Sequence, residues 1–174
     1  NDLDCGLATD GDADRIGLYD SKGNFVDSHH IILLLIHYMV KYKGMKGKVV
    51  TAFSCSVKVE QMCNHYGLEQ ETVQIGFKHI AGKMITEDVL LGGEESGGIA
   101  TAGHIPERDG IWMGLILFEF MAKSGKSLEK KIRSEPHISV VIRPRSFNLW
   151  SSLLYEKQRL YKKQFQHQHQ RLPL

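Results

Sequence analysis

The sequence has few cysteines, no strong excess of charge and no long hydrophobic run. Its three cysteines, Cys5, Cys55 and Cys63, are widely spaced and form no Cys-x-x-Cys pair. This spacing argues against a disulfide framework and against a zinc site, and it predicts reduced thiols in a cytosolic setting. The longest apolar run, IILLLI at 31–36, is far shorter than the roughly 20 residues of a membrane-spanning helix. We therefore expect no membrane partner.

Charges of the two signs nearly balance, with 22 Lys and Arg against 20 Asp and Glu and a formal net charge of +2. The net charge is therefore too small to predict a nucleic-acid partner from the overall electrostatic field. The length of 174 residues and the hydrophobic fraction of 42% are ordinary for a globular protein that buries a core. The chain opens on Asn1 within what reads as a strand, so we expect a fragment of a longer protein.

Predicted strands and helices alternate along the first three quarters of the chain. The strands cover 5–10, 15–20, 48–53, 71–75 and 89–94, and the helices cover 27–43, 57–66, 79–86, 109–125 and 127–132. We interpret the first strand as buried. The alternation indicates an α/β fold with a mixed, largely parallel sheet and flanking helices. After Ser134 the composition turns basic and rich in Gln and His, so we interpret 135–150 as a linker and 151–174 as a solvated helix.

Polar loops follow three of the predicted strands. They are SCS at 54–56, GFK at 76–78 and GGEESGG at 92–98. In parallel sheets ligands bind beyond the carboxyl ends of the strands, because loops and helix N-termini converge there. We therefore expect these loops to share one site.

The stretch ATDGDADRIG crowds three aspartates, Asp10, Asp12 and Asp14, before Arg15. Carboxylates held this close repel one another unless they are protonated or neutralised, and an all-oxygen ligand set suits magnesium. An EF-hand is excluded, because Arg15 and Ser21 stand where that loop needs Gly and Glu. Arg15 could steady a phosphate that completes the metal shell. A plain polar turn at the surface remains the alternative.

The longer stretch LLGGEESGGIATAGHIPERDG concentrates glycines, acids and a hydroxyl. Glu94 and Ser96 are spaced to point the same way if the segment is extended, and carboxylate with hydroxyl suits vicinal sugar hydroxyls. Lys78 of the GFK loop can bind phosphate or act as an acid or base. His104 and Arg108 are further candidates for anion binding. Surface charge on a flexible loop remains the alternative for each of them.

Four motifs, DGDADR, GFK, GGEESGG and HIPERDG, occur in this order and together resemble the phosphoglucomutase/phosphomannomutase enzymes of the α-D-phosphohexomutase superfamily. The resemblance covers residues 1–134 and implies a three-layer α/β/α domain. Residues 1–20 would end the second domain of such an enzyme and carry its metal loop, and 21–134 would form the third, sugar-binding domain. The first and fourth domains would be missing partners, and the resemblance does not extend over 135–174.

The resemblance also implies an activity, the interconversion of hexose 1-phosphate and hexose 6-phosphate through a phosphoserine and a bisphosphorylated sugar. It implies Mg²⁺ as cofactor and hexose phosphate, glucose and/or mannose phosphate, as substrate. The implied roles are magnesium ligation by Asp10, Asp12 and Asp14, phosphate contact by Arg15, acid/base catalysis by Lys78, sugar binding by Glu94 and Ser96, and positions in the cleft for His104 and Arg108.

The sequence departs from the family at the nucleophile, because it contains no loop of the Thr-Ala-Ser-His type. We therefore expect the isolated fragment to be inactive. Two other classes of function stay open. A non-catalytic module that binds sugar phosphates would keep Glu94 and Ser96 but would not need three aspartates. A structural interaction domain would need none of these loops, and its polar residues would scatter over the surface.

Overall fold

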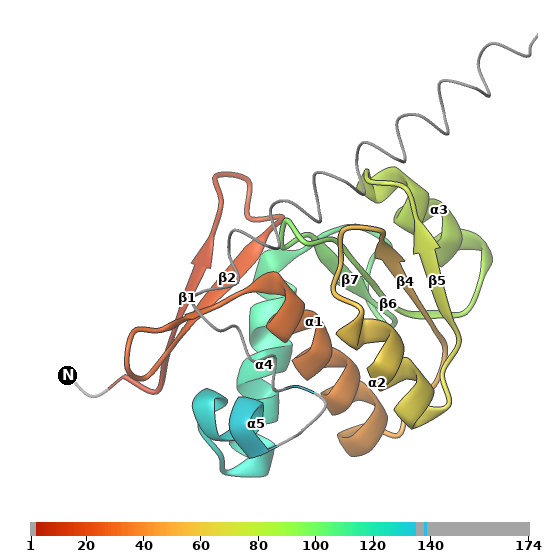
Figure 1. The fold of residues 1–174 in the computed structure, drawn as a ribbon. Helices are drawn as coiled ribbons and strands as arrows, with labels where there is room; N and C mark the ends of the chain where they lie inside the picture. Colours follow the sequence, from red (N-terminus) through yellow and green to blue (C-terminus); the bar gives the residue numbers. More distant parts are fainter. Residues whose placement is uncertain (1–2, 135–137, 139–174) are drawn as a thin grey trace, which may run out of the picture. The chain divides into compact units, whose positions relative to one another are not determined.

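A computed structural model describes residues 3–134 and Ile138, all of which belong to one compact unit, Asn1–Val140. Figure 1 shows the course of the chain through this unit. Apart from Ile138, the predicted linker at 135–150 and the predicted helix at 151–174 lie outside the described residues.

Two sheets make up the strand content of the described residues. The first is antiparallel with the order β1-β2-β3, from β1 (Cys5–Thr9), β2 (Ile16–Asp20) and β3 (Phe25–Val26). The second has the order β5-β4-β6-β7, from β4 (Lys48–Ala52), β5 (Gln70–Val73), β6 (Val89–Gly93) and β7 (Ile99–Thr101). Strand β4 runs parallel to both β5 and β6, whereas β7 is antiparallel to β6. The prediction of a mixed, largely parallel sheet is confirmed.

Helices cover both faces of the second sheet (Figure 1). They are α1 (Ser28–His37) with a π-helical turn η1 (Tyr38–Tyr42), α2 (Lys58–Tyr66), α3 (Phe77–Thr86), α4 (Gly110–Ser124) and α5 (Leu128–Ser134). Successive strand residues point to opposite faces, so Val49 of β4 packs with the core formed by α1, α2 and α4, while Val50 packs with Phe77 and Ile80 of α3. The result is the expected three-layer α/β/α arrangement.

The apolar run at 31–36 forms the centre of this core, because all six of its side chains are fully buried in α1. The run is therefore a core helix. Within the described part of the chain, no helix combines the length and the apolar character that a membrane crossing requires.

Helix ends follow the local chemistry of the sequence. The Asp27 carboxylate accepts the backbone N–H of His30 at the start of α1, and the Asp109 carboxylate accepts that of Trp112 at the start of α4. Gly67 ends α2 in the left-handed conformation expected for a C-terminal glycine. Helix α3 begins at Phe77 rather than at 79, which places Lys78 in its first turn.

The prediction of a buried first strand is wrong. Strand β1 pairs only with β2 and lies at the edge of the small sheet, so its side chains are exposed or half-buried. Strands β3 and β7 were not predicted, because two and three residues are too few to show an alternating pattern.

Candidate functional site

The three polar loops leave the same edge of the second sheet, because β4, β5 and β6 are parallel. They also contact one another. The backbone N–H of Gly76 donates to Glu94 Oε1 at 2.8 Å, and the Ser54 hydroxyl donates to the Glu95 carboxylate. The expectation that these loops converge is confirmed.

The aspartate loop, residues 10–15, connects β1 to β2 and closes a β-hairpin. Asp10, Asp12 and Asp14 each offer a carboxylate oxygen, and these atoms lie within 4.8 Å of one another. Ala13 has a φ of 59°, a left-handed conformation that residues other than glycine seldom adopt, and its N–H donates to the Asp10 carbonyl at 3.1 Å. The curled backbone is what gathers the three carboxylates.

This hairpin docks on the glycine-rich loop and on the start of α4. The N–H of Ile16 donates to the Gly97 carbonyl at 3.1 Å, and the N–H of Gly110 donates to the Ala13 carbonyl at 2.9 Å. A Cβ atom on Gly110 would stand 2.7 Å from the carbonyl oxygen of Arg15, so the approach needs a glycine there. The acidic loop is thereby fixed beside the predicted sugar loop.

Two arginines neutralise part of the acidic cluster. Arg15 Nε lies 2.5 Å from Asp10 Oδ2, and Arg108 Nη2 lies 2.7 Å from Asp14 Oδ2. Loss of hydration raises the pKa of Asp10, but the hydrogen bonds from Arg15 outweigh it and the net pKa is lowered. The pKa of Asp14 is raised, chiefly by loss of hydration and further by Asp12 and Asp10, despite the opposing charge of Arg108.

A hard divalent cation fits these residues. Asp14 Oδ1 is buried and has no hydrogen-bond partner, although buried oxygens are normally bonded. The donors that surround it are carboxylate oxygens, which suit magnesium better than softer metals. A cation held by Asp10, Asp12 and Asp14 would also relieve the repulsion among the three.

The predicted sugar ligands lie on a turn. The N–H of Gly97 donates to the Glu94 carbonyl at 3.1 Å, so the segment is a turn and the condition of an extended segment is not met. Glu94 is 5% exposed and its carboxylate is held by Gly76, whereas Ser96 is exposed. The glycines on both sides favour a turn over an extended strand. Lys78 projects from the first turn of α3, is exposed, and forms no ion pair with any residue that the structure describes.

His104 lies in the loop before α4 and packs against the start of that helix. Its ring stacks on Trp112 with centroids 4.6 Å apart, and its Nε2 lies 2.8 Å from Asp109 Oδ2. Asp109 therefore holds both the first turn of α4 and the imidazole. The structure brings Arg108, by contrast, directly to the aspartate cluster.

Sequence reasoning missed Glu95, which lies between the two predicted sugar ligands. Its carboxylate accepts the Ser54 hydroxyl and its backbone carbonyl accepts the Ser28 hydroxyl, so it ties the turn to α1 and to the loop after β4. An alternating pattern assigns Glu95 to the side away from Glu94 and Ser96. The sequence signal that could have identified Glu95 is the presence of two serines that can donate to it, Ser54 after β4 and Ser28 at the start of α1.

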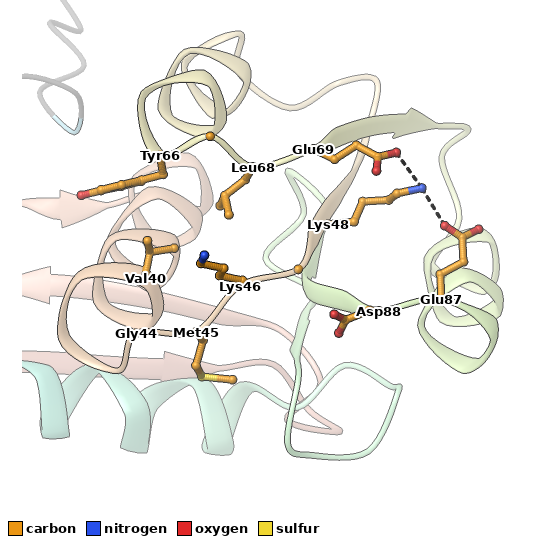
Figure 2. Close-up of a pocket in the computed structure, with 12 residues that line it drawn as sticks. Val40, Gly44, Met45, Lys46, Lys48, Tyr66, Leu68, Glu69, Glu87 and Asp88 are labelled. Carbon is orange, nitrogen blue, oxygen red and sulfur yellow. Dashed lines mark hydrogen bonds and ion pairs between the residues drawn. The ribbon is translucent and has the colours of Figure 1, made fainter.

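A separate hollow of about 640 Å³ lies beside the amino ends of β4 and β6, at the opposite edge of the sheet (Figure 2). None of the predicted site residues lines it. Lys48 lies there between Glu69 and Glu87, at 2.9 and 2.7 Å. The predicted site and this hollow are therefore distinct.

Comparison with known proteins places residues 27–138 in the family described as phosphoglucomutase/phosphomannomutase, alpha/beta/alpha domain III. Phosphoglucosamine mutase of Fusobacterium nucleatum is 36% identical over 135 residues, which cover 76% of this chain and 30% of the relative. A putative phosphomannomutase structure from Thermus thermophilus is 35% identical with a TM-score of 0.74, and the match covers 78% of this chain and 31% of that one. The chain thus spans about a third of the length of these relatives.

Proposed function

Because the chain belongs to the phosphoglucomutase/phosphomannomutase family, we propose that it is part of a phosphohexomutase that interconverts hexose 1-phosphate and hexose 6-phosphate. The reaction would pass through a phosphoserine and a bisphosphorylated sugar. One observation carries the proposal, the docking of the aspartate hairpin on the glycine-rich loop through Ile16 and Gly97. In our proposal residues 1–20 end the second domain of the enzyme and 21–134 form the third.

Asp10, Asp12 and Asp14 would hold Mg²⁺, which when bound offsets the charge that spreads over the oxygens of a transferred phosphoryl group. Arg15 is half-exposed and next to these carboxylates, so its guanidinium can contact a phosphate at the same place. Exposed Lys78 would move the proton of the attacking sugar hydroxyl.

Glu94 and Ser96 would orient the hexose. Glu94 accepts the N–H of Gly76, so its carboxylate is already fixed before a sugar arrives, and Ser96 is exposed to a ligand. Such preorganisation helps to decide which hydroxyl faces the phosphorus. Arg108 and His104 belong to the stretch that would line the cleft. Glucose, mannose and glucosamine phosphates all remain candidate substrates, since the relatives include phosphoglucosamine mutases and a putative phosphomannomutase.

The metal half of the proposal is tested by titrating the chain with Mg²⁺ in a calorimeter. We expect the wild-type chain to bind, and Asp12→Ala to lose most of the binding, because one of three clustered carboxylates is removed. Asp4→Ala is the matched control, since Asp4 is an exposed aspartate outside the cluster. Equal affinity for wild type and Asp12→Ala would refute the metal site.

The sugar half is tested by titrating the same proteins with hexose phosphates. Binding that depends on Glu94 and Ser96 but not on Asp12 or on Mg²⁺ would favour the alternative, a non-catalytic module for sugar phosphates. Binding that is strengthened by Mg²⁺ would favour the mutase.

A further inference from the structure

Arg108 is the side chain that joins the loops of the candidate site. Its Nη2 lies 2.7 Å from Asp14 Oδ2, although the two residues are far apart in the sequence. The side chain is only 32% exposed, so much of the guanidinium is withdrawn from solvent.

The stem of Arg108 rests against the glycine-rich loop. A Cβ atom on Gly98 would stand 2.4 Å from Arg108 Cδ, a distance that real Cβ contacts do not reach. Gly98 in turn forms an isolated β-bridge with Arg15, the residue after Asp14. The glycine therefore leaves room for the arginine to reach across to the hairpin.

The head of Arg108 also contacts the start of α3. Its guanidinium carbon lies 5.5 Å from the centroid of the Phe77 ring, within the range of a cation–π contact. Phe77 is the neighbour of Lys78 in the first turn of that helix. One side chain thus contacts the aspartate hairpin, the glycine-rich loop and the helix that carries Lys78.

We propose that Arg108 is a positioning residue that fixes Asp14 for cation binding, an inference that rests on the proposed function of the aspartate loop. Arg108 occupies Oδ2 of Asp14 and leaves the buried Oδ1 without a hydrogen-bond partner. Outer partners that orient a ligating carboxylate strengthen metal binding, because the carboxylate no longer has to be ordered when the metal arrives.

This positioning role differs from that of a residue that competes with the cation for the Asp14 carboxylate. If Arg108 took the place of the cation, its removal would tighten cation binding. Because Arg108 holds Oδ2 and leaves Oδ1 free of hydrogen bonds, with only the more distant Arg15 Nε at 3.6 Å, the geometry favours the opposite result. It also differs from the role of Arg15, which is half-exposed and pairs closely with Asp10 at 2.5 Å but only loosely with Asp14 at 3.6 Å.

The test compares Arg108→Met and Arg108→Lys with the wild-type chain in Mg²⁺ and Mn²⁺ titrations. We expect Arg108→Met to weaken binding by about 10- to 100-fold, as loss of an outer partner of a metal ligand does. Arg108→Lys keeps the stem and a positive charge but loses the planar fork, so its loss should be smaller. Lys126→Met, which removes an exposed cation elsewhere, is the control. Unchanged or tighter binding by Arg108→Met would overturn the proposal.

A second measurement separates this inference from the proposed function. In the metal-free chain we expect Arg108→Met to speed amide hydrogen exchange at Ile16 and Gly110. The Ile16 N–H bonds the hairpin to Gly97, and the Gly110 N–H bonds the start of α4 to Ala13 of the hairpin. The N–H of buried Val49 in β4, which bonds to the Glu69 carbonyl, reports global opening. If the wild-type chain binds no cation, the cation site fails. The hydrogen-exchange rates then test whether Arg108 holds the hairpin in place. Unchanged rates at Ile16 and Gly110 in Arg108→Met would refute that role.

Discussion

At the scale of single residues, the acidic cluster could be predicted from sequence but its partner could not. The alternate spacing of Asp10, Asp12 and Asp14 was enough to predict that their carboxylates gather, and they do. The contact between Asp14 and Arg108 depends on how two separate sheets dock. No local pattern encodes such docking, so Arg108 was identified only as a candidate for anion binding.

Glycines at the docked hairpin give a prediction at the same scale. We expect Gly110→Ala to destabilise the chain by about 1–3 kcal/mol, the usual cost of forcing atoms into a packed site. The new methyl group would lie 2.7 Å from the Arg15 carbonyl oxygen and 3.0 Å from that of Ala13. Urea unfolding followed by circular dichroism gives the free energy of unfolding.

Gly82→Ala is the matched control for this substitution. Gly82 lies in the middle of α3, and a Cβ atom there meets nothing within 4 Å. Alanine is a better helix former than glycine, so this variant should be more stable by about 0.5–1 kcal/mol. A Gly110→Ala variant as stable as wild type would show that the close approach at the hairpin is not needed.

At the scale of elements, the helices followed from the sequence because their ends carry side-chain signals. Asp27 and Asp109 cap the starts of α1 and α4, and Gly67 caps the end of α2, close to the predicted ends of these helices. The strands were harder to predict. The hydrophobic pattern of a strand depends on which of its faces are buried, and burial is decided by the tertiary fold. Strand β1 is as apolar as an inner strand, yet it lies at the edge of the small sheet.

The amino edge of the second sheet provides an element-scale prediction on pH. Lys83 and Lys48 donate to Glu71 and lower its pKa below 4.5, and Lys48 and Lys83 likewise lower the pKa of Glu87. Carboxylates with a lowered pKa in the folded state add stability above their unfolded pKa. That stability is lost as the pH falls through the folded pKa. We therefore expect this edge to lose stability below about pH 4.5, by a modest amount because the groups are partly exposed.

Lys83→Met tests this expectation. The variant removes the ion pairs of Lys83 with Glu71 and Glu87, each at 2.9 Å. It leaves in place the contacts of Lys48 with Glu69 and Glu87 that Figure 2 shows. Melting temperatures measured from pH 7 to pH 3 should fall less steeply for the variant than for wild type. Lys126→Met serves as the control for a lost surface charge. If the melting temperatures of Lys83→Met and wild type fall in parallel as the pH is lowered, the ion pairs of Lys83 contribute nothing to the loss of stability in acid.

At the scale of the whole molecule, the convergence of the loops argues against a purely structural interaction domain. Such a domain would scatter its polar residues, whereas the glycine-rich loop contacts both the aspartate hairpin and the start of α3. The sequence predicted this because parallel strands send their loops to one edge. It could not predict which residues hold the loops together, since Glu95 and Arg108 act through contacts between distant segments.

The last prediction concerns turnover by the chain alone. We expect no conversion of glucose 1-phosphate in the presence of Mg²⁺ and glucose 1,6-bisphosphate, measured by ³¹P NMR, because the sequence contains no nucleophile loop of the family's type. The nearest Ser-His pair is Ser28 and His29, but Ser28 is buried in the first turn of α1 and donates to the Glu95 carbonyl. A hydroxyl engaged in this way is poorly placed to accept a phosphoryl group. Steady product formation that disappears in Ser28→Ala would contradict this prediction and identify Ser28 as the nucleophile.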